Sequence, residues 1–443
     1  MMNLFTIAAQ GAQAAQNQLS VSAGNIANQQ TAGYSRQQIT QTASLVDAIG
    51  NGVRTSDASR ITDQTLNQAL WRTQSSAGYY QSLNSWGTSL EKVISSSATQ
   101  PSTLLTSFFN SVSALTSQPD STAYRQQLIS SATSLATGLS QTSQTLADQQ
   151  TSIGQQQQST IQQVNQLSSN IADLNQQIER LGAGAESNSL QDQRDQQVKT
   201  LSGLIAVSVE KTDTGSYTLT TQGTTLVAGK QAAVISSGSD TQGNGQLQSR
   251  LGQASSTLST ATGGQLGALY DYQQQVLSPL QTQVTDLMSS VSDQVNNTLA
   301  KGYDLQGEQG KALFNVSTDS AGVSTLATTD ITPAQLGLSL EQKTPANGGN
   351  LTALSGLQTT SGFTDHAAAI TSHLALANSQ SSNQLAVANA VNQQWQQQRD
   401  NLSAVNKDEE AVNLQTYLQS YQANMKVMSV GNQLFTELLT LFS

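Results

Sequence analysis

The sequence of 443 residues contains no cysteine and only two histidines. The absence of cysteine excludes disulfides, thiolate nucleophiles and thiolate metal ligands. Charged residues make up 10% of the chain and aromatic residues 5%, while Gln, Ser, Thr, Asn and Ala fill long stretches. Such a composition is typical of repetitive helical assemblies more than of compact enzymes. We therefore expect thin helical layers around small cores.

Positive charge is also scarce. The chain has 18 Lys and Arg against 28 Asp and Glu, a formal net charge of -10, and no basic run that could neutralise a phosphate backbone. No stretch reaches the roughly eighteen uninterrupted apolar residues that a membrane helix requires. The first basic residue is Arg36, so the start lacks the charged region of a secretory signal peptide. We expect neither nucleic acid nor membrane as a partner, and no cleaved signal peptide.

Residues with catalytic potential are few. His366 and His373 lie seven positions apart in an expected helix, but neither cysteine nor a third histidine is present to complete a metal site. Asp192, Arg194 and Asp195 could be a carboxylate pair for acid-base work. We interpret them as alternating charges on an exposed loop or helix start, where local salt bridges form. The sequence thus predicts no catalytic residue, no metal site and no cofactor.

The first thirty residues predict one helix. Alternating steps of three and four place one narrow stripe on it, which suits a coiled-coil seam. The stripe consists of Phe5, Ala8, Ala12, Ala15, Leu19, Ser22 and Ile26. Because its alanines supply little apolar area, this helix is marginal alone and needs a partner.

The C-terminal segment carries a stronger version of the same pattern. Acidic residues at 408–410 occupy its opening turn, where negative charge meets the positive end of the helix dipole. The stripe consists of Ala411, Leu414, Leu418, Tyr421, Met425, Met428, Asn432, Phe435, Leu439 and Phe442. Large apolar side chains near a chain end need cover. Docking on the same chain and docking on another molecule both remain open.

Between the two ends, periodicity predicts further helices and one β region. The expected helices span about 66–94, 121–181, 264–299 and 365–407. The β-prone runs are 207–210, 217–221 and 225–227, separated by turn residues. Pro279 should kink its helix or mark a first turn. The segment 301–365 is rich in Gly, Thr and Ser and predicts a second β or irregular unit.

The segment 22–36 resembles the N-terminal signature of axial proteins of the bacterial flagellum. That pattern is Asn-hydrophobic-Ala-Asn, then Thr, then Gly-Tyr and a basic residue. The matching positions are Asn25, Asn28, Thr31, Gly33, Tyr34 and Arg36. The physical reading agrees, because Asn can end a helix and Gly can adopt backbone angles closed to other residues.

Three further stretches resemble the hook-associated protein 1 family of hook-filament junction proteins. They are 190–196, 264–269 and 405–414, the last followed by Tyr417 and Tyr421. The resemblance covers nearly the whole chain in matching order except 301–365, an insertion shorter than in many members. It implies an extracellular structural adaptor in the flagellum, exported by the type III apparatus. The implied partners are other copies in a ring, the hook protein, a second hook-filament junction protein, and an export chaperone on the C-terminal helix.

Together these observations predict a mainly α fold with small β-rich insertions. We expect elongated, nested domains in which the N- and C-terminal helices pair in a coiled-coil-like inner tube around which a helical-bundle body is built. The expected domains are 1–35 with 405–443 as the terminal helical domain, 36–300 with 366–404 as the helical body including a β meander at about 207–260, and 301–365 as a short outer insertion. The two seams and the signature residues are the expected assembly interface.

Two other functions were weighed. One is a different type III-secreted coiled-coil structural or translocator protein, against which the 28–36 turn argues. The other is an axial protein with an enzymatic insertion. An insertion of about sixty-five residues is small for an independent catalytic domain, and it lacks a His-Glu-x-x-His motif. We therefore expect a structural protein.

Overall fold

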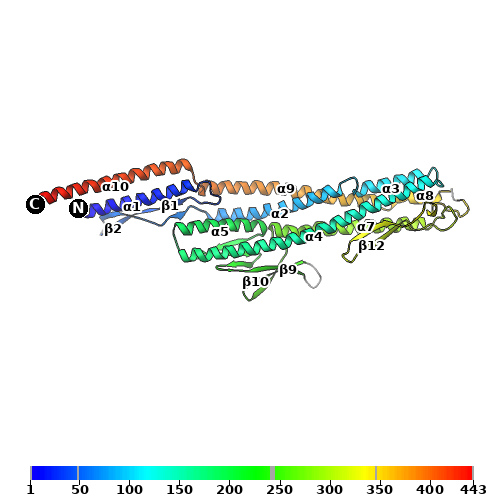
Figure 1. Ribbon diagram of the computed structural model, residues 1–443, viewed down its shortest axis with the longest axis horizontal. Coiled ribbons are helices and arrows are strands. Elements are labelled where there is room, and N and C mark those ends of the chain that lie inside the picture. The colour runs from blue at the N-terminus through cyan, green and yellow to red at the C-terminus, as the bar shows by residue number, and fades with distance from the viewer. Residues whose placement is uncertain (1, 47–48, 240–244, 345–346, 442–443) are drawn as a thin grey trace. The chain divides into compact units, whose positions relative to one another are not determined.

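A computed structural model describes residues 2–46, 49–239, 245–344 and 347–441 (Figure 1). The chain folds into two compact units, each assembled from separate parts of the sequence. Unit 1 comprises 1–78, 161–264 and 387–443, and unit 2 comprises 79–160 and 265–386. Both termini therefore belong to unit 1.

The terminal helices of unit 1 are long. Helix α1 spans Met2–Ala27 and helix α10 spans Lys407–Leu441, close to the limits that periodicity predicted. Figure 1 shows the two helices side by side, with the N- and C-terminal ends of the chain at the same end of the pair. The pair is therefore antiparallel, and the prediction that the terminal helices pair is confirmed.

Short strands follow α1 in the region that we expected to be helical body. They are β1 Gln37–Gln38, β2 Gln41–Val46, β3 Ile49–Thr55 and β4 Ser59–Arg60. Strands β2 and β3 form an antiparallel hairpin that packs along α1. The sequence reading missed this hairpin because its short strands, with two glycines in β3, carry too few apolar residues for a clear alternation.

The other β region of unit 1 contains seven strands in two antiparallel sheets. The first sheet has the order β5-β6-β7-β8 and the second β11-β10-β9. Their bounds are β5 Ser208–Lys211, β6 Tyr217–Thr221, β7 Thr224–Ala228, β8 Gln231–Ala232, β9 Val234–Ser239, β10 Gly245–Leu251 and β11 Ala254–Leu258. Consecutive strands pair with each other within each sheet, as expected of a meander.

Helix α5 (Ala185–Leu204) was not predicted as a full helix. Several long helices have many residues in both units, namely α2 Gln64–Ile94, α4 Thr122–Leu181 and α9 Phe363–Ser403. Helix α3, Pro101–Leu115, lies in unit 2 and was also not predicted. Its proline stands in the first turn, where a missing N–H costs no hydrogen bond.

The expected helix over 264–299 is divided into three segments. They are α6 Gly264–Tyr272, a π-helical segment Gln273–Leu277 and α7 Ser278–Leu299. Pro279 lies in the first turn of α7, directly after the π-helical segment. The prediction that this proline marks a first turn is therefore confirmed.

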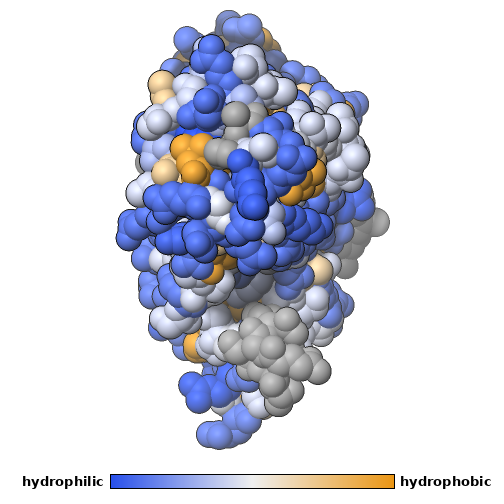
Figure 2. All heavy atoms as spheres, turned by 90° about the vertical axis from the view of Figure 1, so that its right-hand side faces the viewer, coloured by the Kyte–Doolittle hydropathy of each residue, from blue (hydrophilic) through white to orange (hydrophobic). Residues whose placement is uncertain are grey.

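The segment 301–365 lies within unit 2 and contributes to its core. It contains β12 Phe314–Thr318, β13 Ser324–Thr328, the 3-10 helix Pro333–Gln335 and α8 Gly349–Thr360. Phe314, Leu336 and Leu351 are buried among the aliphatic side chains of α3, α4 and α7. Figure 2 shows a mostly hydrophilic face, on which hydrophobic residues occur in small separate patches.

A buried arginine ties this segment to α4. Arg125 donates hydrogen bonds to the carbonyl oxygens of Pro119, Pro333 and Leu336, at 2.7, 3.1 and 2.9 Å. Its burial lowers the pKa of the guanidinium to about 10. The side chain thereby satisfies carbonyls that would otherwise lack partners in a dry core.

Candidate assembly interface

The pairing of α1 with α10 depends on close approach at glycines. A Cβ added at Gly11 would lie 2.5 Å from Oδ1 of Asn424, and one added at Gly431 would lie 3.0 Å from the ring of Phe5. The predicted alanines of α1 are buried beside these contacts. Small residues therefore bring the two helices together, with little apolar area at each contact.

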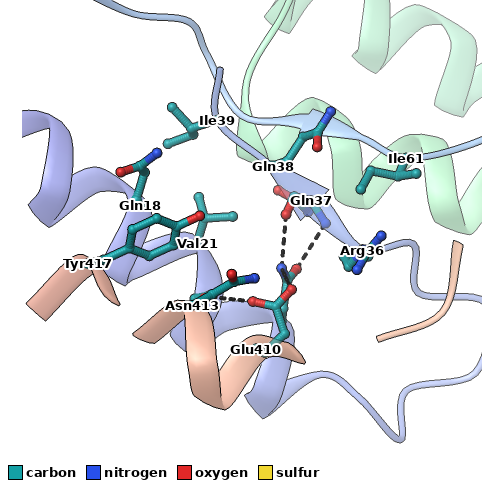
Figure 3. A pocket seen from close by; sticks show the side chains of 12 residues that line it. Gln18, Val21, Arg36, Gln37, Gln38, Ile39, Ile61, Glu410, Asn413 and Tyr417 are labelled. Atoms are coloured by element: carbon teal, nitrogen blue, oxygen red, sulfur yellow. Dashed lines mark hydrogen bonds between the residues drawn. The ribbon is translucent and has the colours of Figure 1, made fainter. Parts of the chain in front are cut away.

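A cluster of hydrogen-bonded side chains joins the other end of the pair (Figure 3). We call Ser22, Asn25, Tyr34, Gln37 and Glu410 the polar clamp. Ser22 Oγ and Asn25 Nδ2 both donate to the Glu410 carboxylate, the latter at 3.2 Å. Figure 3 labels Gln37 and Glu410 of this cluster. Asn25 and Glu410 are only 1% and 3% exposed. This buried carboxylate therefore depends on α1 for its hydrogen bonds.

Asn25 is the centre of the clamp. Its Nδ2 also donates to the carbonyl of Gln37 at 2.9 Å, and its Oδ1 accepts from the Gln37 N–H and from Tyr34 Oη, each at 2.9 Å. One side chain thus connects the last turns of α1, the following turn, strand β1 and the first turn of α10. The signature predicted that Asn25 is functional but not which groups it binds.

The signature residues after Asn25 form the turn that ends α1. Asn28 Nδ2 donates to the carbonyl of Gly24 at 2.9 Å, and the N–H of Thr31 donates to the carbonyl of Asn28 at 2.9 Å. Gly33 has a φ of 84°, which strains any residue with a Cβ. Arg36 then pairs with Glu409 of α10 at 2.6 Å. The turn therefore brings the following residues into contact with α10.

Burial affects the ionisation of the clamp. It raises the pKa of the Tyr34 phenol to about 12, with a further contribution from the negative charges of Asp192 and Glu410. The phenol therefore remains protonated and keeps donating to Asn25 at neutral pH.

Asp192 and Arg194 are buried and Asp195 is half-buried, so our interpretation of an exposed, locally paired cluster was wrong. Arg60 of β4 pairs with Asp192 at 2.6 Å and with Asp195 at 2.9 Å, and Asp192 also accepts from the N–H of Ser35 at 3.1 Å. The Arg194 guanidinium lies 3.4 Å from the ring centroid of Tyr217. Local sequence could not reveal these partners, because Arg60 lies more than a hundred residues away.

The predicted seam positions fall into several groups. On α1, the three alanines are buried, and Phe5, Leu19 and Ile26 are half-buried. On α10, Leu414, Tyr421 and Met428 are half-buried, whereas Leu418, Met425, Asn432 and Phe435 are exposed. Leu439 belongs to α10, and Phe442 lies outside the described residues. Part of the predicted stripe therefore has no cover within the chain.

A second apolar series on α10 was missed. We call Val427, Val430, Leu434 and Leu438 the α10 ridge. They follow one another at steps of three and four and are between 37% and 47% exposed. At 100° per residue, the ridge lies roughly a quarter turn around the helix from Asn424, Met428 and Gly431, which face α1. A search for a second periodic series beside the first could have found it.

The described part of the chain contains neither a cluster of metal ligands nor a membrane-spanning helix. His366 and His373 are exposed. Across the described residues, no group of three or more His, Cys, Asp or Glu side chains is arranged to hold a metal ion. Within the same residues, no helix is long and apolar enough to cross a membrane.

The comparisons with known proteins agree with this architecture. The model of the flagellar hook-associated protein FlgK helical domain matches residues 88–314, just over half of the chain. The chain belongs to the FlgK family. A second model, the C-terminal region of the flagellar basal body rod proteins FlgE, FlgF and FlgG, matches 396–441 and thus α10. The predicted resemblance to the family is confirmed, and both matches lie outside the signature turn.

Individual FlgK relatives extend the match. Flagellar hook-associated protein 1 of Salmonella typhimurium is 32% identical over 71% of this chain, and that of Bacillus subtilis is 27% identical over 46%. The aligned region spans 60% and 43% of those relatives' own lengths. The flagellar hook junction protein FlgK of Burkholderia pseudomallei has a similar structure, with a TM-score of 0.52 and 28% identity over 57% of this chain and 47% of that one.

Proposed function

We propose that this FlgK-family protein is a structural adaptor that joins hook and filament, and that it assembles with other copies through α1 and α10. The observation that carries the proposal is the uncovered apolar surface of α10. Leu418 and Phe435 are 46% and 49% exposed, and the helix that presents them matches the rod-protein family. Exposed apolar side chains at regular helical steps are typical of an interface that another helix covers.

The wider setting belongs to the same proposal. The copies form a ring on the flagellum outside the cell, in contact with the hook protein and with a second hook-filament junction protein. A chaperone covers α10 during export. It performs no catalysis. The predicted seam and signature residues form the interface and the turn that orients it.

The first prediction tests the interface at the exposed seam positions. Leu418→Glu or Phe435→Glu places a charge in an apolar layer between copies, which costs several kcal/mol where the charge is unpaired. Cells with either variant as their sole copy should make hooks, lose filaments and release flagellin into the medium. Filament number is counted by electron microscopy, and flagellin in the medium by immunoblot.

Gln415→Glu and Gln422→Glu are the matched controls, because both positions are exposed on the same helix. Both should retain filaments. Secretion of every variant is measured separately, since the same surface serves the proposed chaperone. Normal filaments with exported Leu418→Glu and Phe435→Glu proteins would contradict the proposal.

A further inference from the structure

A pocket in unit 2 lies among helix α2, helix α6 with the π-helical segment that follows it, and helix α9. Its volume is about 270 Å³, near the lower end of the range of about 300–1,000 Å³ that is usual for small-molecule sites. All of its lining residues belong to unit 2. The pocket is therefore large enough for one small molecule or one long side chain.

The pocket carries negative charge that the described chain does not neutralise. Asp271 of α6 is the one acidic residue among the described residues that line it, and none of those residues is basic. Its Oδ2 accepts a hydrogen bond from Tyr79 Oη at 2.7 Å, and none of the described ion pairs includes it. A carboxylate can accept several hydrogen bonds. Asp271 thus has both charge and acceptor capacity to offer a ligand.

The π-helical segment contributes a backbone acceptor beside this carboxylate. In an α-helix the carbonyl of Gln275, which lines the pocket, would accept from the N–H of residue 279. That residue is Pro279, which has no N–H, and the π-helical hydrogen bond runs instead from the N–H of Ser278 to the carbonyl of Gln273. The carbonyl of Gln275 has therefore lost its α-helical donor. π-helical turns of this kind are frequent at functional sites.

Two aromatic rings complete the lining. Tyr79 and Tyr80 of α2 lie with their ring centroids 5.1 Å apart and their planes at 90°. The face of an aromatic ring attracts a cation, and the side-chain amides of Gln380 and Gln384 on α9 supply further oxygen acceptors. Carboxylate, carbonyl and ring therefore all favour a cationic ligand with several N–H groups.

We propose that this pocket binds an alkylguanidinium group. The inference goes beyond the adaptor function and does not depend on it. A guanidinium is planar, presents its N–H donors in a fixed fork and stacks on aromatic faces, whereas an ammonium is a compact and strongly hydrated charge. The group comes either from a free small molecule or from an arginine side chain of a neighbouring protein, and both sources offer the pocket the same chemistry.

Calorimetric titration of the purified full-length protein with butylguanidinium tests the inference. We expect saturable binding to the wild type and none of the neutral butylurea, which has a similar shape. Asp271→Asn keeps an oxygen that can accept from Tyr79 but removes the charge, so affinity for butylguanidinium should fall about tenfold or more. Asp286→Asn is the matched control, because Asp286 is an exposed acid of the same unit, and it should bind as the wild type does. Absent binding, or equal affinity of wild type and Asp271→Asn, overturns the inference.

The aromatic contribution is tested at Tyr80. Tyr80→Phe keeps the ring and should bind butylguanidinium like the wild type, whereas Tyr80→Leu keeps an apolar side chain without a ring and should bind more weakly. Thermal unfolding of each variant shows that it is folded at the titration temperature. If folded Tyr80→Leu retains the affinity of the wild type, the guanidinium does not lie in this pocket and the inference is overturned.

Native mass spectrometry of the protein purified from cells distinguishes the two sources. An added mass that is present on the wild type and absent from Asp271→Asn assigns a free small molecule to the pocket. The bare mass of the wild type, together with binding of butylguanidinium in the titration, assigns the pocket to an arginine side chain of another protein.

Discussion

At the scale of single residues, Asn25 explains why a polar signature recurs at the end of an otherwise small-residue helix. An asparagine side chain offers both donors and acceptors, and here its four hydrogen bonds reach three segments of the chain, at Tyr34, Gln37 and Glu410. A carboxylate could not donate, and a serine could not reach all four groups. The residue positions α10 without contributing apolar contacts.

Substitution of Asn25 should therefore destabilise unit 1. Asn25→Ala leaves several buried groups without partners, at about 1–3 kcal/mol each, and Asn25→Asp places a second carboxylate beside Glu410. We expect a lower thermal unfolding midpoint in both variants, measured by circular dichroism. Asn28→Ala removes two hydrogen bonds from the same turn, those to Gly24 and Thr31, and serves as control. Equal unfolding midpoints for the Asn25 and Asn28 variants would show that Asn25 stabilises unit 1 no more than Asn28 does.

The raised pKa of Tyr34 predicts that the folded protein loses stability in alkaline solution. Its folded pKa is about 12, above the value near 10 expected in the unfolded chain. The folded state therefore binds the proton more tightly, so this stabilisation is complete below about pH 10 and is lost as the pH rises through about 12. Between those limits, the unfolding midpoint of the wild type should fall more steeply than that of Tyr34→Phe. Parallel curves would contradict the assignment of this pH dependence to Tyr34. Because both proteins contain the other tyrosines, the difference between their two curves removes the contribution of those residues.

At the scale of elements, glycine determines where helices cross. Within unit 1, a Cβ added at Gly78 of α2 would lie 2.2 Å from the backbone carbonyl oxygen of Gly203 in α5. Backbone atoms cannot move aside as a flexible side chain can. The two helices therefore approach each other with nothing between their backbones at this point.

Gly78→Ala should separate these helices and destabilise the protein by about 1–3 kcal/mol, as overpacking does. Gly154→Ala is the control, because a Cβ at that position of α4 meets nothing within 4 Å. The control should be neutral or stabilising by up to about 1 kcal/mol, since alanine favours helix. Chemical denaturation measures both. A neutral Gly78→Ala would mean that α2 and α5 can shift without cost.

Helices whose apolar residues recur at regular steps were predictable from the sequence, whereas elements without such a repeat were not. Helices α1 and α10 carry long series of steps of three and four, which survive in the structure as helices with nearly the predicted limits. The β2–β3 hairpin carries no such series and depends on α1 for support. The salt bridges of Arg60 depend on contacts distant in sequence. Apolar periodicity predicts a local helix, whereas the residues that each side chain contacts depend on the tertiary fold.

At the scale of the whole molecule, the sequence predicted the helix that carries the candidate interface, but not which face of that helix is exposed. The seam read from sequence includes half-buried positions, such as Tyr421, and exposed positions, such as Leu418. A single repeat cannot separate these, because it predicts an apolar face of the helix but not which part of that face another helix covers. The structure was needed to show which side of α10 the chain leaves uncovered.

The uncovered side of α10 also determines what experiments on the isolated protein can detect. Changes at Val430 or Leu434 remove no contact that a single folded chain makes at its core, so a survey of melting temperatures would class these positions as tolerant. The same changes act once for every copy in an assembly, and their effects accumulate with copy number. Positions that look dispensable in the test tube would then be the ones under the strictest selection in the cell.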